Sequence, residues 1–205
     1  MIHYYDIRPG SPLWYEWITA SQVAGVCGLD PYRSRAETWR RRQEKTSPPM
    51  SEAMIWGNLH EEDALDKIRH ILGIDLYVNR MLCANDKLPF LAATPDAFTI
   101  DDEPIEVKCP FFSRDTYETP PLHYLVQIMV QMAICEKDTC IFASWTPWDF
   151  SAQRICFSRE MFRAIYAEVA EFAFLTEEPP RFKRGEKAKR NEFFASFPLI
   201  VETLV

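Results

Sequence analysis

The stretch TPDAFTIDDEPIEVKCP, residues 94–110, decides the fold of this chain. Apolar and β-branched residues lie on both sides of the turn-like residues 101–104, which predicts two short strands joined by a tight connection. Because side chains alternate across a strand, Glu106 and Lys108 share one face of the second strand. Asp96, Glu106 and Lys108 can therefore converge. Two carboxylates for a hard divalent cation, with an ammonium beside them, are the groups that hydrolysis of a phosphodiester needs.

The segments around this stretch predict helices that flank a sheet. Expected helices cover residues 18–28, 36–45, 52–72, 122–135 and 158–175, further strands cover 74–84, 139–145 and 153–157, and a loop covers 46–50. This order predicts an α/β (α+β) fold with a central mixed β-sheet flanked by helices. Because 205 residues suit one domain, we expect a single domain over 1–205, with a basic and then apolar C-terminal tail from about residue 179.

The composition limits the class of protein. Hydrophobic residues make up 47% of the chain, enough to fill a core and to argue against general disorder. The net charge of −7 argues against a surface coated in positive charge, but a basic groove can coexist with an acidic exterior. The six cysteines form no C-x-x-C pair, and neither a secretion signal nor a membrane-spanning run is visible, so we expect free thiols in the cytoplasm. A phosphate-binding G-x-x-x-x-G-K-[ST] loop and a Gly-flanked serine nucleophile are both missing from the sequence.

Glu61 is a second acid that needs an explanation. It falls at helical spacing with Ala64, Leu65 and Ile68, so it is a carboxylate on an otherwise apolar helix face. Acids on a surface hairpin and a helix can be incidental. However, several acids and a lysine in an apolar setting are costly to bury unless their charges balance or a metal binds.

Gln127 and Gln131 lie four residues apart on an expected helix and therefore face the same way. One interpretation is that both amides line the solvent edge of an amphipathic helix. The other is that one amide projects into the acidic site and orients the attacking water or the lysine.

Basic residues fall into three groups. Arg33, Arg35, Arg40, Arg41, Arg42 and Lys45 form the first, Arg114 is the second, and residues 181–190 hold the third. Runs of charge are usually solvated faces, but their segregation in an acidic chain suits a surface that follows DNA phosphates. As DNA contacts, we favour the first group, with Arg33, Arg35 and Arg42, and also Arg114 over the tail. The tail could equally be an arm or a subunit contact.

Several motifs together resemble a known family. Pro95-Asp96 with Glu106-Val107-Lys108 matches the P-D…E-x-K signature of the restriction-endonuclease-like, PD-(D/E)xK, nuclease superfamily. Further blocks follow the order seen in the phage lambda exonuclease family of YqaJ-like alkaline exonucleases. These blocks are Ile18-Thr19-Ala20-Ser21, Trp56-Gly57…Glu61, Thr94-Pro95-Asp96, Glu106 to Pro110 with Ser113-Arg114-Asp115, and Tyr124-x-x-Gln127. The resemblance spans about residues 14–157 and implies a restriction-endonuclease-like core.

The resemblance also implies a role for each matching residue. Asp96 and Glu106 would hold Mg²⁺ together with the Val107 carbonyl, and Glu61 would serve a second Mg²⁺, with Mn²⁺ as a substitute. Lys108 would activate or position the attacking water, and Gln127 would support it. The residues at the family's pocket for the terminal 5′ phosphate are Ser21, Thr94 and Arg114.

The implied activity is metal-dependent and processive degradation of one strand of double-stranded DNA from its 5′ end, which leaves 3′ overhangs. Family members typically form a ring-shaped homotrimer and work with a single-strand annealing recombinase in phage recombination. The expected setting is the cytoplasm of a bacterial cell that carries the phage or prophage, with no membrane partner. The rival hypotheses are another nuclease of this superfamily, an endonuclease or one of opposite polarity, and a non-catalytic DNA-binding scaffold.

Two features near the expected DNA end are left open. The family usually has an arginine shortly before Ile18, in an R-x-G-x-I-T pattern, whereas this chain reads WYEWIT at residues 14–19, with Arg8 the nearest arginine upstream. Met54 and Ile55 could either wedge apart the terminal base pair or lie in the core.

Overall fold

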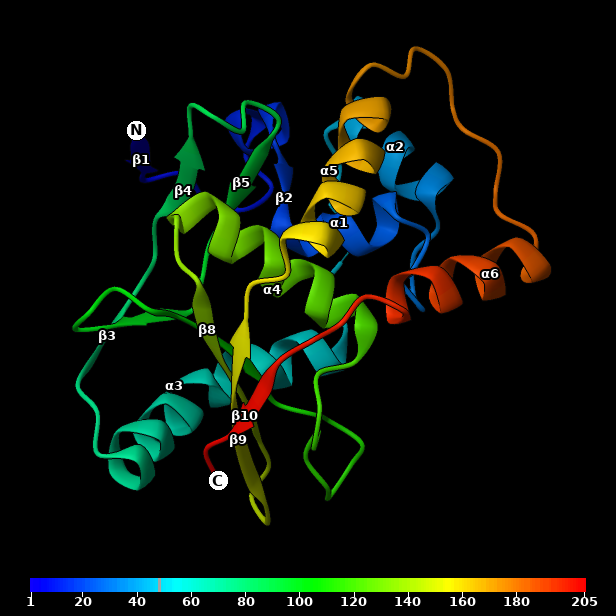
Figure 1. Ribbon diagram of the computed structural model, residues 1–205. Coiled ribbons are helices and arrows are strands. Elements are labelled where there is room, and N and C mark those ends of the chain that lie inside the picture. Colours follow the sequence, from blue (N-terminus) through cyan, green and yellow to red (C-terminus); the bar gives the residue numbers. More distant parts are fainter. Residues whose placement is uncertain (48) are drawn as a thin grey trace.

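The computed structural model describes residues 1–47 and 49–205, so Pro48 of the expected loop lies outside the described residues. Within that part, the strands form two sheets (Figure 1). The four-stranded sheet has the order β1 (Ile2–Tyr5), β4 (Leu82–Asn85), β5 (Leu91–Ala93) and β2 (Ile18–Thr19). The six-stranded sheet has the order β10 (Val201–Thr203), β9 (Phe150–Cys156), β8 (Thr139–Trp145), β7 (Pro104–Lys108), β6 (Ala97–Thr99) and β3 (Leu76–Val78).

Helices cover both faces of the six-stranded sheet, as the sequence predicts (Figure 1). The central helix α4 (Leu122–Cys135) packs on β7 and β8 and also contacts β4 and β5 of the other sheet. Helix α3 (Glu52–Leu72) lies on the opposite face against β7 and β8. The remaining helices are η1 (Pro12–Glu16), α1 (Ala20–Val26), α2 (Arg35–Glu44), α5 (Arg159–Ala173) and α6 (Arg184–Ala195).

Strand β7 shows the alternation that its sequence predicts. Ile105 and Val107 pack with Ala64, Leu65 and other residues of α3 in one apolar cluster. Glu106 instead faces α4, where two glutamine amides meet it. The period of two along β7 therefore separates the core face of the strand from the polar face.

Helix α3 begins and ends where local signals place it. The Ser51 hydroxyl accepts a hydrogen bond from the Met54 amide at 3.3 Å, which satisfies one free amide of the first turn. Gly73 ends the helix with φ of +64°, a left-handed conformation that glycine adopts without strain. Because α3 is one continuous helix that packs against β7 and β8, it fixes the position of Glu61 relative to the sheet.

The prediction of one strand over 74–84 is wrong. The segment forms β3 and β4, which belong to different sheets, because a turn at Asn79–Met81 redirects the chain. The predicted helix over 18–28 is also partly wrong. Its first two residues form β2, which pairs parallel with β5, and only Ala20–Val26 is helical.

The C-terminal tail packs against the rest of the chain. Phe194 of α6 is 1% exposed and belongs to the main apolar cluster. Strand β10 extends the six-stranded sheet through antiparallel pairing with β9. The burial of an aromatic side chain and the strand pairing hold this segment in place, so it is not a free basic arm.

None of the helices within 1–47 and 49–205 combines the length and apolar character that crossing a bilayer requires.

Candidate active site

Glu106 is the centre of a polar cluster between β7 and α4. Its side chain is 1% exposed, and its Oε1 accepts hydrogen bonds from Lys108 Nζ and, at 2.6 Å, from Gln127 Nε2. Gln131 Nε2 donates to the other carboxylate oxygen. The structure therefore brings together three of the predicted catalytic residues. Both amides point into the acidic site and so do not line a solvent edge of α4, while the orienting of water or of the lysine by an amide stays a prediction.

Asp96 joins this cluster from the neighbouring strand. The pairing of β6 with β7 ends where the Asp96 amide donates to the Ile105 carbonyl at 3.0 Å. One residue pair further along, Asp96 Oδ2 accepts a hydrogen bond from the Val107 amide at 2.7 Å. Because the amide and carbonyl of one strand residue point to the same side, the Val107 carbonyl faces Asp96 and not β8.

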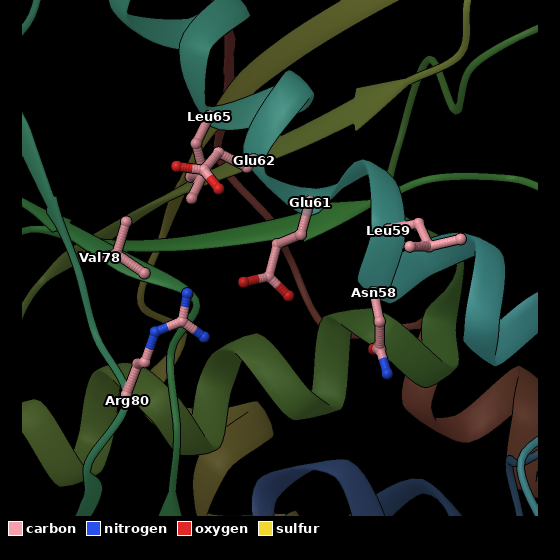
Figure 2. A pocket seen from close by; sticks show the side chains of 7 residues that line it. All are labelled: Asn58, Leu59, Glu61, Glu62, Leu65, Val78 and Arg80. Carbon is pink, nitrogen blue, oxygen red and sulfur yellow. The ribbon is translucent and has the colours of Figure 1, made fainter.

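Glu61 reaches the site from α3. It is half-buried and projects into a pocket of about 380 Å³ (Figure 2). The lining residues are Asn58, Leu59, Glu61, Glu62, Leu65, Val78 and Arg80. Figure 2 shows the Glu61 carboxylate and the Arg80 guanidinium pointing toward each other across this space.

The acids of the site are incompletely neutralised. Burial raises the pKa of Asp96 well above its usual value, and the charge of Glu106 adds to this shift. Burial also raises the pKa of Glu61, against the opposing effect of Arg80. Burial lowers the pKa of Lys108, but Glu106 and Asp96 outweigh it and raise that pKa overall. One lysine therefore faces more carboxylate charge than it can neutralise.

This donor set fits a hard divalent cation. Two carboxylates and a backbone carbonyl are the oxygen ligands that Mg²⁺ takes, and the excess negative charge is what a cation would neutralise. Within the described residues, however, no three acidic, histidine or cysteine side chains already converge as ligands. Lys108, Gln127 and Gln131 donate to both oxygens of Glu106. These donors would have to release part of the Glu106 carboxylate for a cation to bind.

An aromatic neighbour of Lys108 was not assigned a role from the sequence. Lys108 Nζ lies 5.0 Å from the centroid of the Tyr124 ring, within the range of a cation–π interaction. The same ring is 4.1 Å from His123, whose ring is 6.4 Å from the exposed Tyr32. The aromatic series connects Lys108 with the loop before α2. In the sequence, the one signal for this contact with Lys108 is that Tyr124 lies three residues before Gln127.

Ser21 and Thr94 emerge from the same edge of the four-stranded sheet. Strands β2 and β5 are parallel with Thr19 opposite Ala92, so the residues that follow leave on the same side. Both side chains are exposed. Thr94 is also two residues before Asp96, which brings this edge to the carboxylate site.

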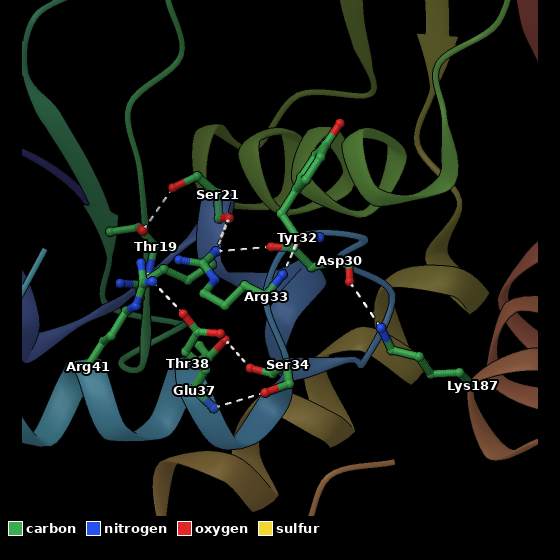
Figure 3. Close-up of polar contacts among 11 residues, drawn as sticks. Thr19, Ser21, Asp30, Tyr32, Arg33, Ser34, Glu37, Thr38, Arg41 and Lys187 are labelled. Atoms are coloured by element: carbon green, nitrogen blue, oxygen red, sulfur yellow. Dashed lines mark hydrogen bonds and ion pairs between the residues drawn. The ribbon is translucent and has the colours of Figure 1, made fainter. Parts of the chain in front are cut away.

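Arg33 stands beside Ser21 (Figure 3). Its guanidinium donates to the Ser21 carbonyl at 3.1 Å and pairs with Asp30 at 3.3 Å. Asp30 also accepts the Arg33 amide at 3.1 Å, and its own carbonyl accepts from Lys187 of α6 at 3.3 Å. Arg33, in the loop before α2, is thus a basic group beside Ser21 in a chain that lacks the arginine of the R-x-G-x-I-T pattern before Ile18.

Arg114 lies in the loop after β7. Its carbonyl accepts a hydrogen bond from the Thr146 hydroxyl at 2.8 Å. Its exposed guanidinium lies 5.4 Å from the centroid of the Trp148 ring and makes no contact with Ser21 or Thr94 among the described residues. The structure therefore leaves Arg114 free for a ligand but does not bring it into the Ser21 group.

Two other predicted DNA contacts are engaged inside the protein. Arg35 is 4% exposed, donates to the Val26 carbonyl at 3.0 Å, and pairs with Glu168 and Glu171 of α5. Arg42 donates to the Trp17 carbonyl, and burial lowers its pKa. The Arg35 contacts join α1, α2 and α5, so we remove Arg35 from the expected DNA surface. The Arg42 contact anchors α2 to Trp17.

Met54 and Ile55 are 47% and 42% exposed on the first turns of α3. They are therefore not core residues, which was one of the two interpretations. Their exposure is compatible with the other, a wedge at the terminal base pair, and that role stays a prediction.

A family model for the YqaJ-like viral recombinase domain matches residues 3–138. The chain belongs to this family. The resemblance drawn from the sequence motifs is confirmed. No curated protein sequence matches this YqaJ-like chain.

Solved structures share the fold of this YqaJ-like chain. An alkaline exonuclease from Laribacter hongkongensis, LHK-Exo, is 23% identical with a TM-score of 0.64, covering 88% of this chain and 92% of its own. The same enzyme in complex with dAMP gives a TM-score of 0.67 at 23% identity, with coverages of 89% and 93%. A phage-related exonuclease from Haemophilus somnus is 11% identical with a TM-score of 0.60, covering 89% and 97%. At these identities the likeness establishes the mixed α/β fold.

Proposed function

We propose that this YqaJ-like chain is a metal-dependent exonuclease that hydrolyses one strand of double-stranded DNA processively from the 5′ end and leaves 3′ overhangs. The observation that carries the proposal is the convergence of Asp96, Glu106 and Lys108, with Gln127 on Glu106. Glu61 faces the adjoining pocket. This is the set of groups that phosphodiester hydrolysis requires, and the family to which the chain belongs includes recombination exonucleases.

Asp96, Glu106 and the Val107 carbonyl would hold one Mg²⁺ and Glu61 a second, with Mn²⁺ as a substitute. Bound there, the metal would lower the pKa of the attacking water and offset charge on the scissile phosphate. Lys108 supplies positive charge beside the reacting phosphate and orients the water. Gln127 and Gln131 donate to the Glu106 carboxylate and fix its position between β7 and α4.

For the DNA end, we propose that Ser21, Thr94 and Arg33 bind the terminal 5′ phosphate, with Arg114 contributing from the loop after β7. The shared edge of β2 and β5 supports the first two residues. The contact of Arg33 with the Ser21 carbonyl supports its place in the pocket. Arg33 would then supply the cation that other family members draw from the segment before Ile18.

The remaining parts of the proposal rest on the family alone. We propose that the chain assembles as a ring-shaped homotrimer around DNA, with Met54 and Ile55 parting the terminal base pair. It would act with a single-strand annealing recombinase in phage or prophage recombination, in the bacterial cytoplasm.

The proposal is tested by incubating the protein with linear duplex and with covalently closed circular duplex in Mg²⁺. We expect nucleotide release from the linear DNA alone and no reaction in excess chelator. Nicking or linearisation of the circle at a similar rate would favour an endonuclease. Stable DNA binding without hydrolysis of either form would favour the non-catalytic scaffold.

A further inference from the structure

Arg80 is a positive charge at the site to which no role has been given. It is exposed in the turn between β3 and β4 and lines the same pocket as Glu61 (Figure 2). No hydrogen bond or ion pair within 1–47 and 49–205 engages its guanidinium. A long side chain that points into a polar pocket without a protein partner is available for a ligand.

The turn that carries Arg80 is fastened to the catalytic segment. The Asn79 amide donates to the Asp96 carbonyl at 3.0 Å, and Asn79 Nδ2 donates to the Pro95 carbonyl at 3.0 Å. The Asn79 side chain also closes the turn, because Nδ2 donates to the Met81 carbonyl at 3.0 Å and Oδ1 accepts the Met81 amide at 3.1 Å. The backbone of Arg80 is therefore fixed relative to Asp96, and only its side chain is free to adjust.

The pocket has the size and chemistry for a phosphate group with its sugar. Its volume of about 380 Å³ lies in the range of small-molecule sites. A guanidinium presents paired N–H groups that match two oxygens of a phosphate. Glu61 and Glu62 also line the pocket and would repel an anion. Phosphate binding should therefore require a divalent cation on the carboxylates, with Arg80 contacting the phosphate from the opposite wall.

We propose that Arg80 binds a deoxynucleotide phosphate in this pocket, either that of the released nucleotide or that of the strand being cleaved. The inference deepens the proposed nuclease function and rests on it. It assigns to the β3–β4 turn a direct part in holding the substrate or product.

Calorimetric titration of the full chain with dAMP in Mg²⁺ tests whether Arg80 binds the phosphate of the released nucleotide. We expect Arg80→Ala to weaken dAMP binding about 10-fold, the loss of one charge-assisted contact. Arg80→Lys should recover part of it, and chelator should abolish binding in all variants. Deoxyadenosine, which has no phosphate, should show no difference in affinity between the unmutated chain and its variants. Arg69→Ala is the matched control, because Arg69 lies on α3 and pairs with Asp66 away from the pocket.

Steady-state digestion of linear duplex tests whether Arg80 binds a phosphate of the strand being cleaved. A lower kcat/KM for Arg80→Ala, with an unchanged pH profile and unchanged dAMP affinity, supports contact with the DNA strand. Unchanged dAMP affinity and unchanged kinetics would overturn the inference. So would a kcat whose pH profile shifts while KM and dAMP affinity stay the same, because Arg80 would then act only as a counter-ion to Glu61. If the unmutated chain digests no DNA, the proposed function fails, while the dAMP titration still reports on Arg80.

Discussion

Replacing Lys108 with alanine is expected to lower the rate of Mg²⁺-dependent hydrolysis of linear duplex DNA by about 10²–10⁴-fold, the range for loss of one positioned catalytic group. Among the residues that the structure describes, Lys108 is the one ammonium that contacts Glu106, and Asp96 also contributes to its raised pKa. The lysine therefore stays charged throughout the pH range in which the enzyme would work. The measurement is nucleotide release from an end-labelled duplex at saturating DNA.

The variant also uncovers the buried Glu106 carboxylate, so a loss of activity could reflect unfolding. Thermal melting and retained binding of duplex DNA in a gel-shift assay separate the two causes. Lys87→Ala is the matched control, because Lys87 is likewise ion-paired, with Glu136 at 2.7 Å, but on the exposed surface. Digestion by Lys108→Ala at the rate of the unmutated chain would show that the catalytic assignment is wrong.

Replacing Asp96 with asparagine is expected to abolish both hydrolysis and the thermal stabilisation that we expect Mg²⁺ to give the unmutated chain. At a Mg²⁺ concentration 100-fold above Kd, binding to the folded state alone contributes about 2.7 kcal/mol. For a chain of this size that corresponds to a rise in Tm of about 5–10 °C. Asparagine keeps an oxygen that can accept the Val107 amide, but it removes the charge that binds the metal. Differential scanning calorimetry with Mg²⁺ and with chelator provides the measurement.

The pH dependence of this effect follows from the raised pKa of Asp96. A raised carboxyl pKa in the folded state favours folding below the ordinary pKa of aspartate, and that contribution is lost as pH rises through the folded-state value. Without metal, Asp96→Asn should therefore melt at or above the temperature of the unmutated chain near neutral pH. The Mg²⁺-induced rise should appear only as pH increases through the raised pKa, because the metal needs the ionised acid. A Mg²⁺-induced rise of equal size in Asp96→Asn would contradict the assignment of the ligand.

The parts of the site that follow from local periodicity could be predicted from the sequence. The period of two along β7 places Glu106 and Lys108 on one face, and the four-residue spacing of Gln127 and Gln131 aims both amides at Glu106. The start and end of α3 likewise follow from Ser51 and Gly73. In each case the residues that determine the local structure lie within a few positions of it in the sequence.

The parts that depend on distant partners could not be predicted. A run of arginines does not reveal that Arg35 meets Glu168, a residue 133 positions along the chain. Arg80 belongs to no motif, and its place opposite Glu61 arises only because β3 and β4 join different sheets. The burial of Phe194 similarly depends on the packing of α6 against core residues that are distant in the sequence.

The most direct test of the account is digestion of a duplex labelled on each strand, with a 5′ phosphate, a 5′ hydroxyl or a blocked 5′ end. We predict Mg²⁺-dependent loss of the strand that begins with a free 5′ end, fastest with the phosphate, and the preference for phosphate should fall in Arg33→Ala. A blocked 5′ end should protect its strand even when the 3′ end is free. Unchanged digestion of duplex with blocked 5′ ends would contradict the proposal that this chain is a 5′-end exonuclease.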